Sequence, residues 1–181
     1  METIKLMFTR LQNEIFRLMC IKSGNKLNLS DISKALKVSV SAVSKSVPHL
    51  EKLGLVKIEK DKKMNLTLIT LERAKKKTIQ LKRIENLKMI YEYGLSDYLE
   101  EEFTGGTIIL FGSYSRGDDI TNSDIDIAII GRKEKNIDLK SFEETFERKI
   151  IINFYHSFEE IHKHLKENIF NGILISGGIE L

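Results

Sequence analysis

The sequence predicts two domains joined by a long helix: a mainly α domain with a β-hairpin, then an α+β domain with a mixed sheet. Three observations carry this prediction. Apolar residues recur three and four apart through the first 54 residues, which is typical of helices, and residues 55–71 alternate as a hairpin does. Residues 95–181 alternate strand patterns with helical ones. Residues 72–94 keep helical spacing, without a linker rich in glycine, serine or proline.

Composition and charge bound the classes of function. The 181 residues are 41% hydrophobic and 30% charged, as in globular proteins. Apolar runs are only a few residues long, so we expect no membrane span, no signal peptide, no membrane partner and a cytoplasmic location. The one cysteine, Cys20, has apolar neighbours and is expected to be a buried hydrophobic residue, which excludes an intramolecular disulfide and a cysteine-ligated zinc site.

Charge is distributed unevenly along the chain. Residues 1–88 hold 20 basic and 8 acidic side chains, whereas residues 89–181 hold 9 and 18. The first half therefore suits a polyanion and the second suits cations. Solvated helix faces are the alternative explanation of the same counts.

Three helices are expected in the N-terminal half. The first covers residues 6–23. The second begins after Ser30, a residue that favours the N-cap position. The third begins at Ser39 or Ser41 and ends at Gly54, because glycine readily adopts the left-handed conformation that closes helices. Pro48 falls inside the third helix and is expected to kink it or to shorten its regular part.

A hairpin follows the helices, with strands in LVKIEK and NLTLITL and a polar turn, DKKM, between them. This order, with the runs DISKALKVSVSAVSKSV and HLEKLGLVKIEK, resembles the winged helix-turn-helix family of DNA-binding domains. The resemblance implies that the third helix enters the major groove of double-stranded DNA and that the hairpin contacts the flanking backbone. The residues implicated are Ser41, Ser44, Lys45, Lys60, Lys62 and Lys63. A protein-interaction or dimerisation module of the same fold is the alternative.

We expect a DNA-binding domain at residues 1–71, a bridging helix at residues 72–94 and a second domain at residues 95–181. The bridging helix needs a partner for an apolar stripe, either the chain's own domains or a second copy in a homodimer. The stripe is formed by Ala74, Thr78, Leu81, Ile84, Leu87 and Tyr91.

The second domain is expected to contain strands in TIILF, IDIAII, KIIINFYH and GILI. SDYLEEEF is expected to be helical, and two SFEE sequences, beginning at Ser141 and Ser157, are expected to be capping boxes that open helices. The predicted architecture is a mixed sheet with helices on one side.

Two aspartates, Asp124 and Asp126, lie two residues apart at the start of a predicted strand. Side chains alternate along a strand, so the two carboxylates share a face about 6 to 7 Å apart. Their repulsion is relieved by a divalent cation, and a few oxygen ligands suit Mg²⁺. Gly112 and Ser113 follow the preceding strand, where backbone amides and a hydroxyl can bind an anion.

The run LFGSYSRGDDITNSDIDIAI resembles the hallmark of the DNA polymerase beta superfamily, in particular its minimal nucleotidyltransferases. The resemblance covers residues 107–130 in detail and residues 95–181 in the order of elements. It implies that Gly112 and Ser113 contact the triphosphate and that Asp124 and Asp126 are catalytic and bind Mg²⁺. Arg116 matches a family arginine and has either a phosphate-binding or a structural role. The implied reaction transfers a nucleoside monophosphate from a triphosphate, with ATP the expected donor, to a macromolecular acceptor such as a protein or a toxin partner.

The sequence departs from the family pattern at the third carboxylate, on the strand after the next helix. We assign that position to Asn153, whose amide could ligate a metal but is no general base. Glu147 and Asp119 are the candidate substitutes for it. The alternative function is therefore a DNA-binding transcriptional regulator whose nucleotidyltransferase-like domain is inactive or only senses nucleotide. A pure protein-interaction module is a third possibility.

Overall fold

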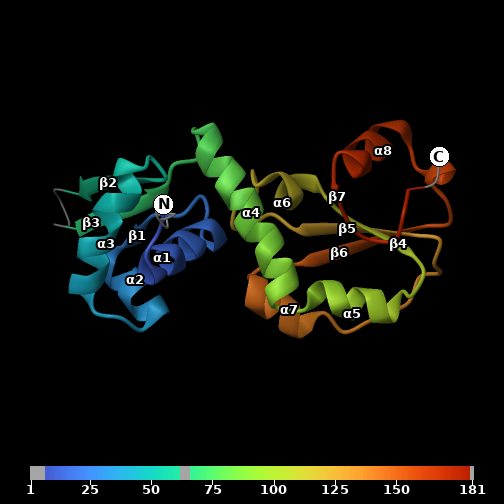
Figure 1. Cartoon of the computed structure of the whole chain (residues 1–181), viewed down its shortest axis with the longest axis horizontal. Helices are drawn as coiled ribbons and strands as arrows, with labels where there is room; N and C mark the ends of the chain where they lie inside the picture. The colour runs from blue at the N-terminus through green and yellow to red at the C-terminus, as the bar shows by residue number, and fades with distance from the viewer. Residues whose placement is uncertain (1–6, 62–65, 180–181) are drawn as a thin grey trace, which may run out of the picture. The chain divides into compact units, whose positions relative to one another are not determined.

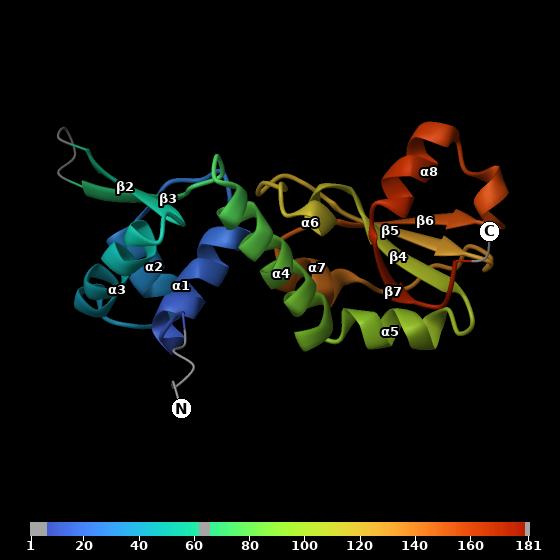
Figure 2. The ribbon, with the colours of Figure 1, turned by 45° about the horizontal axis from the view of Figure 1, so that its top comes forward.

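The computed structural model describes residues 7–61 and 66–179 and divides into two compact units, residues 1–78 and 79–181. Figure 1 and Figure 2 show the elements of each unit in chain order. Within the described ranges, no helix is both long enough and apolar enough to cross a bilayer.

In its described residues, the first unit contains three helices and a small antiparallel sheet with the strand order β1-β3-β2. Its elements are α1 (Arg10–Ile21), β1 (Leu27–Asn28), α2 (Leu29–Leu36), α3 (Val40–Lys52), β2 (Val56–Asp61) and β3 (Leu66–Leu71). The three helices and the hairpin confirm the predicted order, whereas the two-residue strand β1 was not predicted. Its core is apolar and is formed by Ile15, Phe16, Met19, Ile32, Val43, Val47, Leu50, Leu55 and Ile69.

The helix ends of this unit follow from individual side chains. Ser39 caps α3 by accepting a hydrogen bond from the backbone N–H of Ala42 (3.1 Å), and Gly54 adopts φ +74° just beyond the helix, both as predicted. The expected cap at Ser30 is wrong. Asn28 is the cap, because its side chain accepts from the N–H groups of Ser30 and Asp31 while Asp31 accepts from the N–H of Asn28.

Pro48 does not end α3, which continues to Lys52. The side chain of Pro48 is exposed, whereas Val47 and Leu50 on either side of it are buried. The regular part of the helix is therefore not shortened at the proline.

Residues 79–179 of the second unit form a four-stranded mixed sheet with the order β6-β5-β4-β7, in which β5 and β6 pair in parallel and the other neighbours pair antiparallel. This confirms the predicted mixed sheet. The elements are α4 (Lys76–Glu92, which begins in the first unit), α5 (Leu95–Glu102), β4 (Thr107–Phe111), α6 (Gly112–Arg116), β5 (Ile125–Ile130), α7 (Lys140–Phe146), β6 (Ile150–Tyr155), the 3₁₀ turn η1 (Phe158–Glu160), α8 (Lys163–Phe170) and β7 (Ile173–Ser176).

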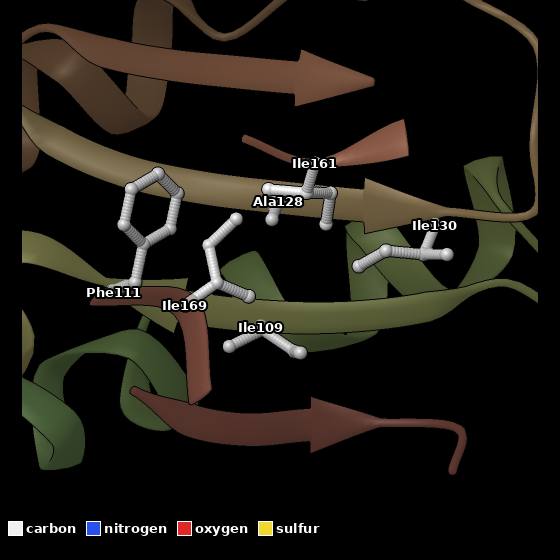
Figure 3. Packing of buried hydrophobic residues seen from close by; sticks show 6 residues of the cluster. All are labelled: Ile109, Phe111, Ala128, Ile130, Ile161 and Ile169. Carbon is white, nitrogen blue, oxygen red and sulfur yellow. The ribbon is translucent and has the colours of Figure 1, made fainter. Parts of the chain in front are cut away.

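Helices cover both faces of this sheet, so the expectation of helices on one side is wrong. On one face, residues of β4 and β5 pack against Ile161 and against Ile169 of α8, as Figure 3 shows. On the other face, the ring of Phe103 lies 5.4 Å from that of Phe154 in β6, and Figure 1 shows α5 and α8 on opposite sides of the strands. The sheet is therefore enclosed, which explains why IDIAII is apolar on both faces except at Asp126.

The two SFEE sequences do not act as capping boxes. Helix α7 begins at Lys140, one residue before Ser141, and the N–H of Lys140 donates to the side chain of Asp138 (3.0 Å). Ser157 precedes only the 3₁₀ turn η1 and makes no capping hydrogen bond through its side chain. A nearby carboxylate has replaced the serine as a partner for the first helical N–H at α7.

The buried residues of α4 are mostly polar and differ from the predicted apolar stripe, of which only Thr78 is fully buried; they are Thr78, Lys82, Glu85, Asn86, Met89 and Ile90. Ile84 is 61% exposed and Tyr91 is 48% exposed, whereas Lys82 and Asn86 are buried. The stripe is therefore wrong as a description of what α4 packs against. The physical reason is a buried carboxylate on another segment, described below.

Candidate functional site

Asp124 and Asp126 meet the end of β4 at one edge of the sheet. Asp124 is the last residue of the loop before β5 and is exposed, whereas Asp126 lies in β5 and is half-buried. Asp126 pairs in register with Phe111, the last residue of β4, and Gly112 follows directly. The sheet pairing therefore brings together two segments that are separate in the sequence.

Gly112 lies directly against the carboxylate of Asp126. Its φ is +74°, and a Cβ built on it would overlap Oδ2 of Asp126 and lie 3.2 Å from Cγ. Glycine therefore lets the main chain approach Asp126 at this point. The next residue, Ser113, is partly exposed, and its carbonyl accepts from the N–H groups of Gly117 and Asp118 to close the short turn α6.

The carboxylate of Asp126 is in an unfavourable environment for its charge. Burial raises the pKa of Asp126 above its ordinary value, the charge of Asp124 raises it further, and the guanidinium of Arg116 lowers it. Arg116 is itself exposed and pairs with Asp118 (3.3 Å). A cation bound between the aspartates would relieve both the repulsion and the desolvation.

The position beside Asp126 on the next strand is occupied by an apolar residue. In the parallel pairing of β5 with β6, Asp126 is opposite Ile151, and Asn153 is opposite Ala128. Asn153 therefore lies two residues, or about 7 Å, farther along the strand than the neighbour of Asp126. Ile151 is 40% exposed.

The two carboxylates considered as substitutes differ in accessibility. The side chain of Asp119 is completely buried between Lys82 and Arg148, so it cannot serve as a substitute ligand at the site of Asp124. Glu147 is exposed and shares a cavity of about 660 Å³ with Asp124. The cavity is lined by Thr121, Asn122, Ser123, Asp124, Lys140, Glu143, Glu144, Glu147, Arg148 and Lys149.

The site fits a metal ion whose ligands are mostly water or substrate oxygens and not protein side chains. Among the described residues, no group of three or more histidine, cysteine, aspartate and glutamate side chains is arranged to hold an ion. Asp124 and Asp126 thus supply two carboxylates, and the remaining positions fall to water or phosphate oxygens. Mg²⁺ is commonly bound in this way.

The residues expected to contact DNA lie on the surface of the first unit. Ser41, Ser44 and Lys45 are exposed on α3, and Lys60 is exposed on β2. Lys62 and Lys63 lie outside the described residues. On the same strand as Lys60, Glu59 pairs with Lys57 (2.6 Å) and Lys26 (3.0 Å), and these lysines lower the pKa of Glu59 to about 2.

Sequence reasoning missed Lys82, Asn86 and Arg148, whose side chains contact Asp119. Lys82 and Asn86 are four residues apart and so share a helix face, but several other cations lie on the same helix. No local pattern distinguishes Lys82, which is buried, from the exposed lysines of α4.

Two known family models match separate parts of the chain. Residues 93–175 match the family model described as the nucleotidyltransferase domain. These residues form a nucleotidyltransferase domain. Residues 15–64 match the model described as the N-terminal DNA-binding domain of iron dependent repressors, so the nucleotidyltransferase domain follows a winged-helix DNA-binding domain. No curated protein matches the sequence.

Solved structures that resemble the chain include transcriptional regulators of bacteria and archaea. The adhesin competence repressor AdcR of Streptococcus pyogenes is 21% identical, over 54% of this chain and 69% of that one, with a TM-score of 0.42. A mutant of ZitR of Lactococcus lactis is 25% identical over 56% and 64% (TM-score 0.39), and BldR of Sulfolobus solfataricus is 19% identical over 49% and 61% (TM-score 0.38).

Proposed function

We propose that this chain is an Mg²⁺-dependent nucleotidyltransferase that transfers a nucleoside monophosphate from a nucleoside triphosphate, with ATP the expected donor, to a macromolecular acceptor. The observation that carries the proposal is the Asp124 and Asp126 pair beside Gly112, within a matched nucleotidyltransferase domain. The winged helix binds double-stranded DNA and brings the enzyme to it.

In this proposal, each site residue has a chemical task. Asp124 and Asp126 hold Mg²⁺, and their negative charge, crowded in a partly desolvated place, favours the cation. A bound Mg²⁺ supplies charge neutralisation at the phosphates during displacement. Gly112 and Ser113 receive the triphosphate through backbone N–H groups and a hydroxyl, and Arg116 adds a positive charge at the same edge.

The acceptor approaches from the side of Asp124. The cavity there combines glutamates with Lys140 and Lys149 and is open to a mixed-charge surface rather than to an apolar small molecule. A protein segment, including that of a toxin partner, suits such a lining. On the DNA side, Lys45, Lys60, Lys62 and Lys63 contact phosphates while Ser41 and Ser44 reach base edges. We further propose that the chain acts as a homodimer in the cytoplasm.

A labelling experiment tests the proposed activity. The protein is incubated with triphosphates labelled at the α-phosphate, Mg²⁺ and cell extract, and a labelled macromolecule is expected. Asp126→Asn should abolish the label, whereas Asp97→Asn, an exposed change on α5, should leave it unchanged. Equal labelling by the wild type and Asp126→Asn would refute the proposal.

A second candidate function is a DNA-binding regulator that binds nucleotide without transferring it. Ile151 favours it, because an apolar side chain beside Asp126 adds neither a metal ligand nor a base. This function predicts DNA affinity that falls steeply with salt and changes with Mg²⁺ and ATP, in a protein that labels nothing. DNA binding that is absent, or that salt does not weaken, would exclude it.

A further inference from the structure

The loop of residues 117–124, which ends at Asp124, is attached at its start to α4. Gly117 has φ +81°, and a Cβ on it would lie 2.5 Å from the carbonyl oxygen of Ile79 and 2.7 Å from the backbone N of Arg83. A side chain at residue 117 would therefore push the loop away from the helix. The loop begins in backbone contact with α4.

A buried carboxylate fixes the loop two residues later. Oδ1 of Asp119 accepts hydrogen bonds from Nζ of Lys82 and from Nδ2 of Asn86 (2.8 Å), and Oδ2 accepts from Nη2 of Arg148 (3.4 Å). Nδ2 of Asn86 also donates to the carbonyl of Tyr114 (2.9 Å) in α6. The side chains of Lys82, Asp119 and Arg148 are at most 1% exposed.

The segment that holds Asp119 also holds the far end of the loop. Arg148 contacts Asp119, and the carbonyl of the next residue, Lys149, accepts from the N–H of Ile125 (2.8 Å), directly after Asp124. Glu143 fixes this segment in turn, since its carbonyl accepts from the N–H of Arg148 and its carboxylate accepts from the N–H of Ile150 (3.0 Å). Both ends of the loop are therefore tied to residues 148 and 149.

Two hydrogen bonds close a turn in the interior of the loop, between these attachments. The N–H of Ile120 donates to Oγ of Ser123 (3.0 Å), and the N–H of Ser123 donates to the carbonyl of Ile120 (2.9 Å). Asp124 follows this closed turn immediately. Its place thus depends on where Asp119 and Ile125 are held.

A buried polar cluster of this kind fixes the positions of its side chains more than it raises the free energy of unfolding. Desolvation of buried ions offsets much of their attraction, and apolar side chains of similar size often stabilise as well. Hydrogen bonds to a carboxylate, however, are directional, whereas an apolar contact tolerates sliding. Stability alone therefore does not explain why a lysine, an arginine and an amide converge on Asp119.

We propose that Asp119 is a positioning residue, which Lys82, Asn86 and Arg148 hold so that Asp124 is presented for Mg²⁺ and nucleotide. The inference rests on the proposed function, because it takes Asp124 as a residue that binds Mg²⁺ and nucleotide. Helix α4 begins within the first unit and carries Lys82 and Asn86, so the nucleotide site depends on the helix that leaves the DNA-binding unit.

The test compares two lysines of α4 in the full-length protein. Lys82→Met removes a donor to Asp119 and leaves Arg148 to balance its charge, whereas Lys88→Met removes an exposed partner of Glu92. Two quantities are measured: the dissociation constant of a fluorescent, non-hydrolysable ATP analogue with Mg²⁺, and amide hydrogen exchange of residues 118–125 without ligand. Lys82→Met should raise both the constant and the exchange rates at least tenfold, and Lys88→Met should change each less than twofold.

Asn86→Ala is a second variant that leaves all the buried charges in place and so keeps the test valid if Lys82→Met does not fold. It should raise the dissociation constant about tenfold, because two hydrogen bonds are lost and each is commonly equivalent to about a threefold change. This effect should disappear in an Asp124→Ala background, because a residue that acts through Asp124 has nothing left to position. If Asn86 only stabilised the fold, Asn86→Ala would raise the dissociation constant by the same factor whether residue 124 is aspartate or alanine.

The outcomes separate the inference from the proposed function. Faster loop exchange in Lys82→Met or Asn86→Ala, with no analogue bound by any protein, would refute the proposed function and support the anchoring of the loop. Wild-type exchange and wild-type analogue binding in the folded variants would overturn the inference and leave the proposed function standing.

Discussion

Gly112 and Asp126 fit together so closely that the carboxylate occupies the space a side chain at residue 112 would need. The contact joins the end of β4 to the second residue of β5, and it lies where the proposed phosphate-binding turn meets the proposed metal ligands.

Gly112→Ala should therefore impair the site in two ways. The new Cβ would displace the carboxylate of Asp126, and a φ of +74° is strained for alanine, at a cost of about 1 to 3 kcal/mol in the free energy of unfolding. We expect affinity for Mg²⁺ and nucleotide to fall at least tenfold, as measured by fluorescence titration.

Gly94→Ala is the matched control, since Gly94 has φ +73° and no atom lies within 4 Å of a Cβ built there. It should show the strain in thermal unfolding and bind nucleotide as the wild type does. An equal loss of nucleotide affinity in both variants would show that the contact with Asp126 is irrelevant.

Asp126→Asn should be more stable than the wild type at neutral pH without Mg²⁺. The pKa of Asp126 is raised in the folded protein, so the folded state holds the proton more tightly than the unfolded state, whose pKa is about 3.9. The free energy of unfolding therefore falls as the pH rises from about 3.9 through the pKa of Asp126 in the folded protein. The full loss is present at every pH above that pKa.

Asp126→Asn has no charge at residue 126 and therefore avoids this loss of stability. Its melting temperature should be higher than that of the wild type at pH 8, and the difference should vanish below pH about 3.5. Thermal unfolding across this range measures it. Mg²⁺ should raise the melting temperature of the wild type and not that of Asp126→Asn. A variant less stable than the wild type at pH 8 without Mg²⁺ would contradict the prediction.

Ile151→Asp should strengthen the metal site more than Asn153→Asp does. The β5 and β6 pairing puts residue 151 beside Asp126, so a carboxylate there is near enough to share a cation, whereas residue 153 is beside Ala128. We expect tighter Mg²⁺ binding and more labelled product for Ile151→Asp. A gain confined to Asn153→Asp would instead favour residue 153 as the position of the third ligand.

Lys45→Ala and Lys60→Ala should each weaken DNA binding across all sequences, because a lysine contacts phosphate without reading bases. Each change should reduce the slope of log affinity against log salt by about one. Lys163→Ala, an exposed change on α8 in the other unit, is the control for total charge. Equal effects of all three would indicate that net charge, not the winged helix, attracts DNA.

Features set by neighbouring residues could be predicted from the sequence. Ser39 and Gly54 mark the ends of α3 through local hydrogen bonding and backbone freedom, and the strands TIILF and IDIAII are apolar runs of strand length. The motif that contains Gly112 and the aspartates is likewise contiguous. Asn28 was missed as a cap because two suitable residues lie within two positions of each other.

Features set by distant partners could not be predicted. Residue 151 rather than 153 neighbours Asp126 because of the strand register, which depends on pairing across the sheet. The buried face of α4 depends on Asp119, which is 37 residues from Lys82. Hydrophobic periodicity alone predicts that a lysine of α4 is exposed to solvent. Lys82 is buried because its carboxylate partner, Asp119, lies on another segment of the chain.

The buried polar face of α4 also limits how the molecule can be divided. The family match begins at Tyr93, beyond Lys82 and Asn86, although the compact unit begins at Ile79. A fragment that begins at residue 93 would lack Lys82 and Asn86, the two side chains of α4 that donate hydrogen bonds to Asp119. Water would then reach Asp119 and Arg148. The nucleotidyltransferase domain of this protein therefore depends on part of the helix that precedes it, and a transplant of the domain to another DNA-binding domain must carry that helix along.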